Sequence, residues 1–255
     1  MDHEDEEDPS MKIAGMMRVK NEARWITRAV ESLGRVCGAG IHILDDGSTD
    51  DTTTLASSLG ARVIPTPFDT FDETRDKNFL VREVMTACDP DWIVHIDGDE
   101  ALEEKAVRNL AAFLVASPSG VEAYYLSVLY LWNSEQQIRV DGVYGRFCRA
   151  SVFRTRATDL IFRSSTIGGL HCGNVPADTV SRASVSPFRI KHYGYLDRET
   201  RLNKYAFYNR IDPNNVSEDS YRHVVQGDVP EILATAQLLH AGPLHLAAYQ
   251  EDLGG

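Results

Sequence analysis

Short apolar runs alternate with helix-like stretches through the first half of this 255-residue chain. The apolar runs have the length of buried strands, and they cover residues 12–19, 41–44, 62–64 and 92–96. The stretches between them carry apolar residues at helical spacing, and the predicted helices cover residues 26–33, 51–59, 73–86 and 102–114. This alternation predicts an α/β fold in which helices flank a mostly parallel central sheet.

The second half of the chain has a different pattern. Residues 121–132 and 138–153 are rich in Tyr, Val and Leu and flank a polar segment, which predicts two long antiparallel strands. A loop, a strand and two helices are expected to follow, over residues 168–186, 188–193, 198–210 and 229–246. The chain would then comprise a tail (1–10), an α/β half (11–120), a second half of the same domain (121–196) and a helical C-terminal extension (197–255).

The negative charge of the chain is unevenly distributed. The formal net charge is -12, and residues 1–10 contribute six acidic side chains and no Lys or Arg. Such a segment has little apolar surface to bury, which predicts a disordered tail. The acidic remainder argues against general nucleic-acid binding, which requires a basic face. It is compatible with a nucleotide ligand if a divalent cation lies between the phosphates and the protein.

Cysteine spacing and hydropathy indicate the compartment. The four cysteines, Cys37, Cys88, Cys148 and Cys172, are far apart and form no CxxC pair, so we expect reduced thiols rather than disulfides or a zinc site. The N-terminus is acidic where a signal peptide would be basic. No apolar run approaches the ~20 residues of a membrane span. These features predict a cytoplasmic protein, and they do not indicate its oligomeric state.

Two acidic loops directly follow predicted strands. Asp97-Gly98-Asp99 places two carboxylates at one strand end, and such oxygens are the ligands that Mg²⁺ and Mn²⁺ prefer. The segment 45–50, DDGSTD, offers carboxylates and a hydroxyl to a ribose or a base edge. Each loop is also compatible with a polar turn that caps the next helix. Because ligands of open α/β sheets bind at the carboxyl ends of the strands, both loops are expected at one edge.

Three segments resemble motifs of glycosyltransferase family 2, a group with the GT-A fold. They are residues 18–22 (RVKNE), 44–52 (LDDGSTDDT) and 96–100 (IDGDE), in the order and strand context of that family. The resemblance implies that Glu22 and Asp46, with the adjacent Gly47, contact the nucleoside of a donor. It also implies that Arg75, Asp76 and Asn78 line the donor site. Asp97 and Asp99 would bind the ribose and the metal, with Asp99 the stronger metal candidate.

The second half resembles the family through fewer residues. Residues 191–195, KHYGY, followed by Arg201 and Lys204, are similar to a segment of some members. A late histidine often completes the metal site in such enzymes, and His192 is the candidate, although a lone histidine is more often structural. Arg198, Arg201 and Lys204 are candidates to screen a diphosphate; the alternative is a solvated helix face.

The catalytic base is the least determined residue. Most family members invert the anomeric centre, and inversion requires a base that deprotonates the acceptor. Family members often use an acidic residue here, but Cys172 follows His171 where some relatives carry Glu, and residues 121–195 contain no Glu-Asp pair. His171 is therefore the first candidate, before Asp141 and Asp178. His171 is also compatible with a metal or phosphate contact, and a retaining mechanism remains open.

The expected function is transfer of a sugar from a nucleotide-diphosphate donor, with a UDP, GDP or dTDP carrier and Mg²⁺ or Mn²⁺, to a small-molecule or carrier-linked acceptor. A sugar-1-phosphate nucleotidyltransferase would need a glycine-rich loop after the first strand, where this chain has Lys20-Asn21-Glu22. A Rossmann enzyme would need glycines at the same place. A non-catalytic sugar-nucleotide-binding protein is the remaining alternative.

Overall fold

The computed structural model describes residues 11–156, 159–164, 172–212, 221–228 and 244–251. The helices are α1 (Ile26–Gly34), α2 (Thr52–Ser58), α3 (Glu73–Cys88), α4 (Glu104–Val115) and α5 (Arg198–Ile211), with the 3-10 helices η1 (Ala177–Arg182) and η2 (Tyr221–Val225). The strands are β1 (Ile13–Val19), β2 (Ile41–Asp45), β3 (Arg62–Pro65), β4 (Trp92–His95), β5 (Glu100–Leu102), β6 (Ala123–Trp132), β7 (Ser134–Arg139), β8 (Cys148–Arg154), β9 (Ala183–His192) and β10 (Leu246–Ala248).

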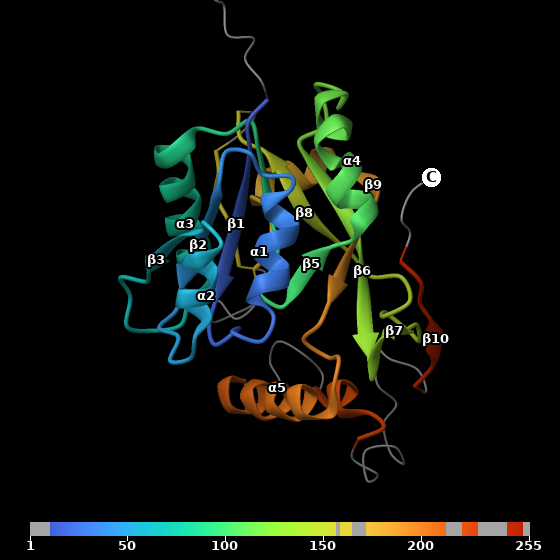
Figure 1. The fold of residues 1–255 in the computed structure, drawn as a ribbon. Helices are drawn as coiled ribbons and strands as arrows, with labels where there is room; N and C mark the ends of the chain where they lie inside the picture. The colour runs from blue at the N-terminus through green and yellow to red at the C-terminus, as the bar shows by residue number, and fades with distance from the viewer. Residues whose placement is uncertain (1–10, 157–158, 165–171, 213–220, 229–243, 252–255) are drawn as a thin grey trace, which may run out of the picture.

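These strands form one sheet within the described residues, in the order β10-β7-β6-β8-β4-β1-β2-β3. β3, β2, β1 and β4 are parallel neighbours, as the alternating pattern predicts. β8 runs antiparallel to both β4 and β6, and β9 pairs with β5 and with β6. The predicted α/β fold with a mostly parallel part and an antiparallel part is therefore confirmed (Figure 1).

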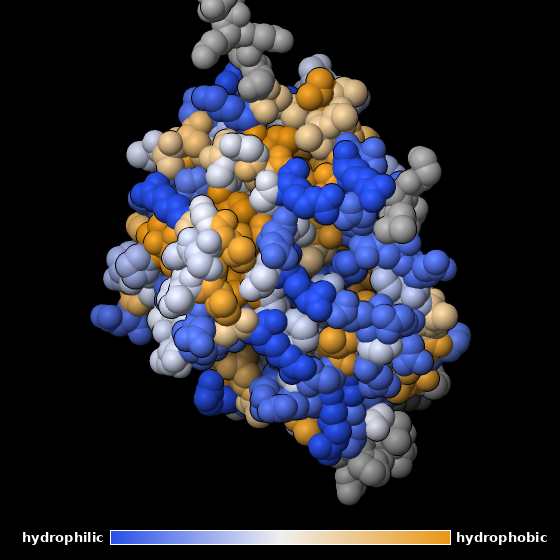
Figure 2. Space-filling view, in the orientation of Figure 1, coloured by the Kyte–Doolittle hydropathy of each residue, from blue (hydrophilic) through white to orange (hydrophobic). Residues whose placement is uncertain are grey.

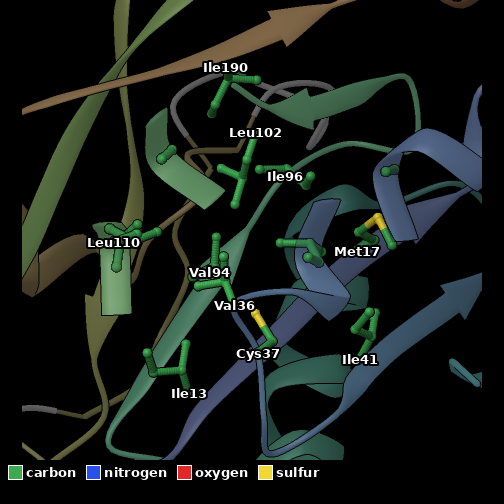
Figure 3. Packing of buried hydrophobic residues seen from close by; sticks show 14 of the residues in the cluster. Ile13, Met17, Val36, Cys37, Ile41, Val94, Ile96, Leu102, Leu110 and Ile190 are labelled. Atoms are coloured by element: carbon green, nitrogen blue, oxygen red, sulfur yellow. The ribbon is translucent and has the colours of Figure 1, made fainter. Parts of the chain in front are cut away.

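Helices cover both faces of the parallel strands. Successive side chains of β1 point to opposite faces, so they join two different cores. Ile13, Met17 and Val19 join the core that contains the apolar faces of α1 and α4. Ala14 and Met16 join a second core with α3. Figure 3 shows the first of these cores, with Met17 of β1 and Leu110 of α4 among its labelled side chains. Strands buried on both faces explain why this part of the sequence has continuous apolar runs rather than strict alternation.

A close approach between α1 and the sheet depends on a glycine in β1. A Cβ added at Gly15 would lie 3.1 Å from Leu33 Cδ1 and 3.3 Å from Ile41 Cγ1. These contacts are tighter than ordinary van der Waals separation, so a larger residue would push α1 outward. Gly15 therefore lets α1 pack directly on β1, the strand that is followed by Lys20-Asn21-Glu22.

Two predicted elements are wrong in their boundaries. Leu102 ends the short strand β5, and the following helix begins only at Glu104. The single long strand expected over 138–153 is instead the end of β7, a connecting segment and β8. The polar residues Asp141, Gly142 and Gly145 interrupt the apolar pattern there, and Gly142 has a positive φ of 52°, which favours a turn over an extended strand.

The two ends of the chain contain predictions that the structure does not describe. The acidic tail over 1–10 and most of the helix expected over 229–246 lie outside the described residues. The extension does contain α5, and its described last part includes β10, which pairs with β7. Among the described residues no helix combines the length and hydropathy of a membrane span. The face in Figure 2 is largely polar, with apolar residues in separate patches.

Candidate active site

The carboxyl ends of three parallel strands bring the predicted loops together. β1 pairs with β2 on one side and with β4 on the other, so the residues after each strand leave at the same edge. The loops touch one another: the N–H of Asp46 donates to the carbonyl oxygen of Val19 at 2.9 Å. A Cβ added at Gly98 would lie 2.9 Å from Glu22 Cγ. The strand ends thus carry Glu22, Asp46, Asp97 and Asp99.

The loop after β2 is held in shape by the loop after β1. The N–H of Asn21 donates to Ser48 Oγ at 2.9 Å, and the N–H of Thr49 donates to Asn21 Oδ1 at 2.8 Å. Gly47 directly precedes these contacts and has a φ of 72°, a backbone conformation that glycine adopts without strain. Gly47 therefore shapes the loop that presents Asp46.

Arg18 joins the loop after β2 to the start of α3. Its Nη2 lies 2.7 Å from Asp46 Oδ2, and its Nε donates to Asp76 Oδ2 at 2.8 Å. Arg75 Nη2 donates to the other oxygen of Asp76 at 2.8 Å, and the Asp76 side chain is fully buried. Asp46, Arg75 and Asp76, which the sequence placed in a donor site, are thus parts of one charged network.

Asp97 is paired with an arginine that the sequence did not single out. Arg149 Nη1, on β8, lies 3.0 Å from Asp97 Oδ2, and the Asp97 side chain is 40% exposed. Arg149 Nη2 also donates to Glu100 Oε2, and that carboxylate is buried. Burial raises the pKa of Glu100 to about 7. Asp97 therefore remains accessible to a ligand, with a fixed positive charge beside it.

Asp99 is buried and faces two groups from the C-terminal half. The ammonium of Lys204, on α5, contacts Asp99 Oδ2, and His192 Nε2, at the end of β9, lies 3.6 Å from the same oxygen. Burial works against ionisation of Asp99, but Lys204 and His192 together outweigh it and leave the pKa of Asp99 below its usual value. Burial lowers the pKa of His192 to about 4, so its imidazole is neutral near pH 7.

Asp99 and His192 offer atoms that suit a divalent cation. Carboxylate oxygens are preferred ligands of Mg²⁺ and Mn²⁺, and a neutral imidazole adds a nitrogen ligand. In this structure the ammonium of Lys204 contacts Asp99 Oδ2. Asp97 faces Arg149 instead, and in the described part of the chain no three His, Cys, Asp or Glu side chains gather around one position. Two of the three predicted metal ligands are therefore close together.

Two predicted donor contacts are structural anchors. Arg201 is 2% exposed, and it pairs with Asp228 and donates to the carbonyl oxygens of Tyr195 and Leu196. Asn78 exchanges hydrogen bonds with the backbone of Phe162, at 2.9 Å in each direction. Their polar atoms are thus engaged within the protein. Arg198, at the start of α5, is exposed.

Two of the three candidate bases, Asp141 and Asp178, lie away from the strand ends. His171 lies outside the described residues. Asp141 is 8% exposed, and its two oxygens accept from Arg139 at 2.8 and 2.9 Å. Asp178 precedes the first residue of β9, whereas His192 ends this ten-residue strand. A strand of that length spans about 30 Å, so Asp178 lies at the opposite end of β9.

A buried lysine was also missed by sequence reasoning. Lys77 Nζ donates to Asn174 Oδ1 at 2.8 Å and to the carbonyl oxygen of Cys172 at 2.9 Å, and it pairs with Glu73 at 2.6 Å. His95, the last residue of β4, contacts the carbonyl oxygen of Asn174 through Nδ1 at 2.9 Å. Lys77 thus ties α3 to the segment beside β4.

Both missed residues left a signal in the sequence. Lys77 shares the buried face of α3 with Leu80, Val81 and Val84, at helical spacing. Arg149 lies within a run of otherwise apolar or small residues. A charged side chain at a core position usually has a buried partner, although the identity of that partner cannot be read from spacing.

Comparisons with known proteins agree with this geometry. The model of the family described as Glycosyl transferase family 2 matches residues 16–125, from β1 into β6. An uncharacterized glycosyltransferase of Rickettsia bellii is 31% identical over 140 residues, which are 54% of this chain and 45% of that protein. The lipopolysaccharide core biosynthesis glycosyltransferase LpsC of Rhizobium meliloti is 31% identical over 109 residues, or 43% of this chain and 39% of LpsC.

The likeness to solved structures concerns the fold. The crystal structure of S. aureus TarS matches 89% of this chain and 44% of TarS, with a TM-score of 0.51 and 13% identity. This chain spans about half the length, or less, of the curated relatives given above. The family motifs, their convergence at the strand ends and the family match lead to one conclusion: residues 16–125 form a region of the glycosyl transferase family 2 type.

Proposed function

We propose that this protein is a metal-dependent glycosyltransferase that moves a sugar from a nucleoside-diphosphate donor to an acceptor, with inversion at the anomeric carbon. The observation that carries the proposal is the meeting of Asp46, Asp97 and Asp99 at one sheet edge, with His192 beside Asp99.

Each loop has a separate role in this proposal. Glu22 and Asp46 bind the nucleoside, and Arg18 keeps the carboxylate of Asp46 in place through its contact at 2.7 Å. Asp99 and His192 hold Mg²⁺ or Mn²⁺, with Asp97 on the same loop. When bound, the cation supplies charge neutralisation for the departing diphosphate. Arg149 fixes the position of Asp97 from the antiparallel part of the sheet.

The acceptor base is proposed to be His171. Asp141 is held by Arg139 and Asp178 lies at the far end of β9, so both are poorly placed to reach an acceptor at the strand ends. The substitution His171→Asn should lower kcat and change the KM for the acceptor much less. It should leave donor binding unchanged. If His171→Asn weakened metal binding as much as it lowered kcat, His171 would be assigned to the metal instead.

The name of one relative supports a proposal for the acceptor class. LpsC is named for lipopolysaccharide core biosynthesis, which supports a saccharide that is itself attached to a carrier. A small soluble acceptor is the second possibility. Incubating the protein with a radiolabelled donor and either free sugars or a lipid-linked saccharide fraction distinguishes the two.

A thermal-shift screen tests the donor site directly. UDP-, GDP- and dTDP-sugars are added with and without Mn²⁺, because a ligand that binds the folded state raises its apparent stability. We expect one donor class to raise Tm only with the metal. Asp99→Asn should abolish the shift and the Mn²⁺-dependent donor hydrolysis, whereas Asp159→Asn, at an exposed position, should preserve both. Binding without hydrolysis or transfer would favour a non-catalytic sugar-nucleotide-binding protein.

A further inference from the structure

The positive charge beside Asp99 is the ammonium of Lys204. Lys204 Nζ contacts Asp99 Oδ2, the same oxygen that His192 Nε2 faces at 3.6 Å. The side chains of Asp99 and Lys204 are 4% and 24% exposed, so the pair is partly shielded from water. Asp99 raises the pKa of Lys204, although burial alone would lower it, and the ammonium therefore stays charged.

An ammonium and a divalent cation cannot share one carboxylate oxygen without strong repulsion. Like charges a few ångström apart repel strongly where water screens them poorly, and the repulsion doubles when one of the two charges is +2. Any metal that binds between Asp99 and His192 must therefore displace Lys204 Nζ. The displaced ammonium then needs another negative partner close by.

We propose that Lys204 is a positioning residue that exchanges partners: it neutralises Asp99 in the free protein and moves to the donor diphosphate when metal and nucleotide bind together. The inference rests on the proposed function, because a diphosphate must bind at the strand ends. A metal at Asp99 would displace Lys204 Nζ from Asp99 Oδ2. A diphosphate held by that metal would then place its anionic oxygens near the displaced ammonium.

The exchange requires movement of one side chain and not of α5. The first turn of α5 is held by Arg201, which pairs with Asp228, and by Asp197, whose Oδ1 accepts from the N–H of Thr200 at 2.9 Å. Lys204 lies one turn further along the same helix. Its four-carbon stem allows the ammonium to move by a few ångström about a fixed backbone.

The backbone beside the pair leaves little room for any other path. A Cβ added at Gly194 would lie 2.5 Å from Lys204 Nζ and 2.8 Å from His192 Cε1. The backbone of Gly194 thus closes one side of the Asp99–Lys204 pair. Any other residue type would place its side chain there. Lys204 Nζ therefore cannot move toward Gly194 when it leaves Asp99.

The exchange has a measurable thermodynamic consequence. In the free protein Lys204 competes with the metal for Asp99, whereas in the complex it stabilises the diphosphate. Mn²⁺ and a nucleoside diphosphate should therefore bind with positive coupling, and each should raise the affinity of the other by the same factor. Removing the ammonium should have opposite effects on the two ligands.

Isothermal titration of Lys204→Met with Mn²⁺ alone, and with UDP, GDP and dTDP at saturating Mn²⁺, tests the inference. We expect Lys204→Met to bind Mn²⁺ alone about tenfold more tightly, and the preferred diphosphate about tenfold more weakly, as for loss of one charge-assisted hydrogen bond. Lys204→Arg should stay close to the native protein in both titrations. Arg210→Met removes a cation at an exposed position of the same helix and should change neither affinity.

The outcomes separate the inference from the proposed function. Unchanged or weaker Mn²⁺ binding by a folded Lys204→Met protein overturns the exchange, and so does unchanged diphosphate binding. A folded native protein that binds neither Mn²⁺ nor any of the three diphosphates overturns the proposed function itself. Circular dichroism and Tm of each variant establish that it is folded, because loss of a partner for buried Asp99 also lowers stability.

Discussion

Glu100 on β5 lies opposite His192 on β9, and this pairing joins the acidic loop after β4 to the C-terminal half of the chain. The N–H of Tyr193 donates to the carbonyl oxygen of Asp99 at 2.8 Å and continues the contact beyond the strands. Asp99 and His192 therefore meet through backbone pairing between segments that are far apart in sequence. Side-chain attraction alone does not place them.

Gly194 is expected to be irreplaceable at this junction. A Cβ at Gly194 would collide with Asp99, Lys204 and His192, so Gly194→Ala should lower the free energy of unfolding by about 1–3 kcal/mol, as overpacking does. It should also weaken Mn²⁺ binding. Urea denaturation and metal titration measure the two effects. Gly120→Ala is the matched control, because a Cβ there meets no atom within 4 Å; equal losses in both variants would contradict the prediction.

Replacing Arg18→Met should affect stability and nucleotide binding together. The change removes one of two arginines from the fully buried Asp76 and frees Asp46 from its contact at 2.7 Å. Loss of a buried partner costs about 3 kcal/mol, which urea denaturation measures. The Kd for the nucleoside diphosphate should rise in the same variant.

The control for Arg18 is an arginine with an exposed partner. Arg62 pairs with Glu83 at 3.4 Å, and the two side chains are 52% and 34% exposed. Exposed ion pairs contribute about 0–1 kcal/mol, so Arg62→Met should change stability little. If Arg18→Met is no more destabilising than Arg62→Met, Asp76 does not depend on Arg18.

Arg201 and Arg198 are expected to differ sharply, although both are cations at the start of α5. Arg201→Met leaves Asp228 and two backbone carbonyl groups without their donor, and it should lower the free energy of unfolding by about 3–5 kcal/mol. Arg198→Met, at an exposed position, should stay within about 0.5 kcal/mol of the native protein. Chemical denaturation of both variants decides the point, and similar values would remove Arg201 as the anchor of α5.

His42 should make the protein less stable in mild acid. Burial lowers the pKa of this β2 side chain in the folded state, whereas the unfolded value is 6.5. The unfolded chain therefore binds more protons below that pH, and the free energy of unfolding falls as pH drops from about 6.5 toward the folded pKa. The slope from this one group is at most about 1.4 kcal/mol per pH unit.

The measurement compares the native protein with His42→Gln between pH 5 and 8. Below pH 6.5 the native protein should lose more unfolding free energy than the glutamine variant as the pH falls. Near pH 8 the difference between the two proteins should be constant. A difference that is constant over the whole range would show that His42 titrates alike in the folded and unfolded states.

The parallel half and its loops could be predicted because local patterns determine them. β1, β2 and β4 are continuous apolar runs that are buried on both faces, and each is followed by polar residues where the strand ends. The rule that ligands bind at the carboxyl ends of such strands was then sufficient to bring Glu22, Asp46, Asp97 and Asp99 to one edge. No long-range contact had to be known.

The second half depends on contacts that the sequence pattern does not encode. The segment over 138–153 is divided into β7 and β8 by a turn, and β8 carries Arg149 to Asp97. Spacing could not distinguish Arg201, which anchors α5, from Lys204, which reaches Asp99, because both are cations on one helix.

The sequence by itself determined the α/β class, the order of the first strands and the acidic loops at their ends, since apolar period and strand-end chemistry are local properties. Tertiary structure alone decided which partner each charged residue has. It placed Lys204 and His192 on Asp99, and it removed Asp141 and Asp178 from the strand ends. The physical reason is that partner choice follows from strand register and helix docking, which join residues about 100 positions apart.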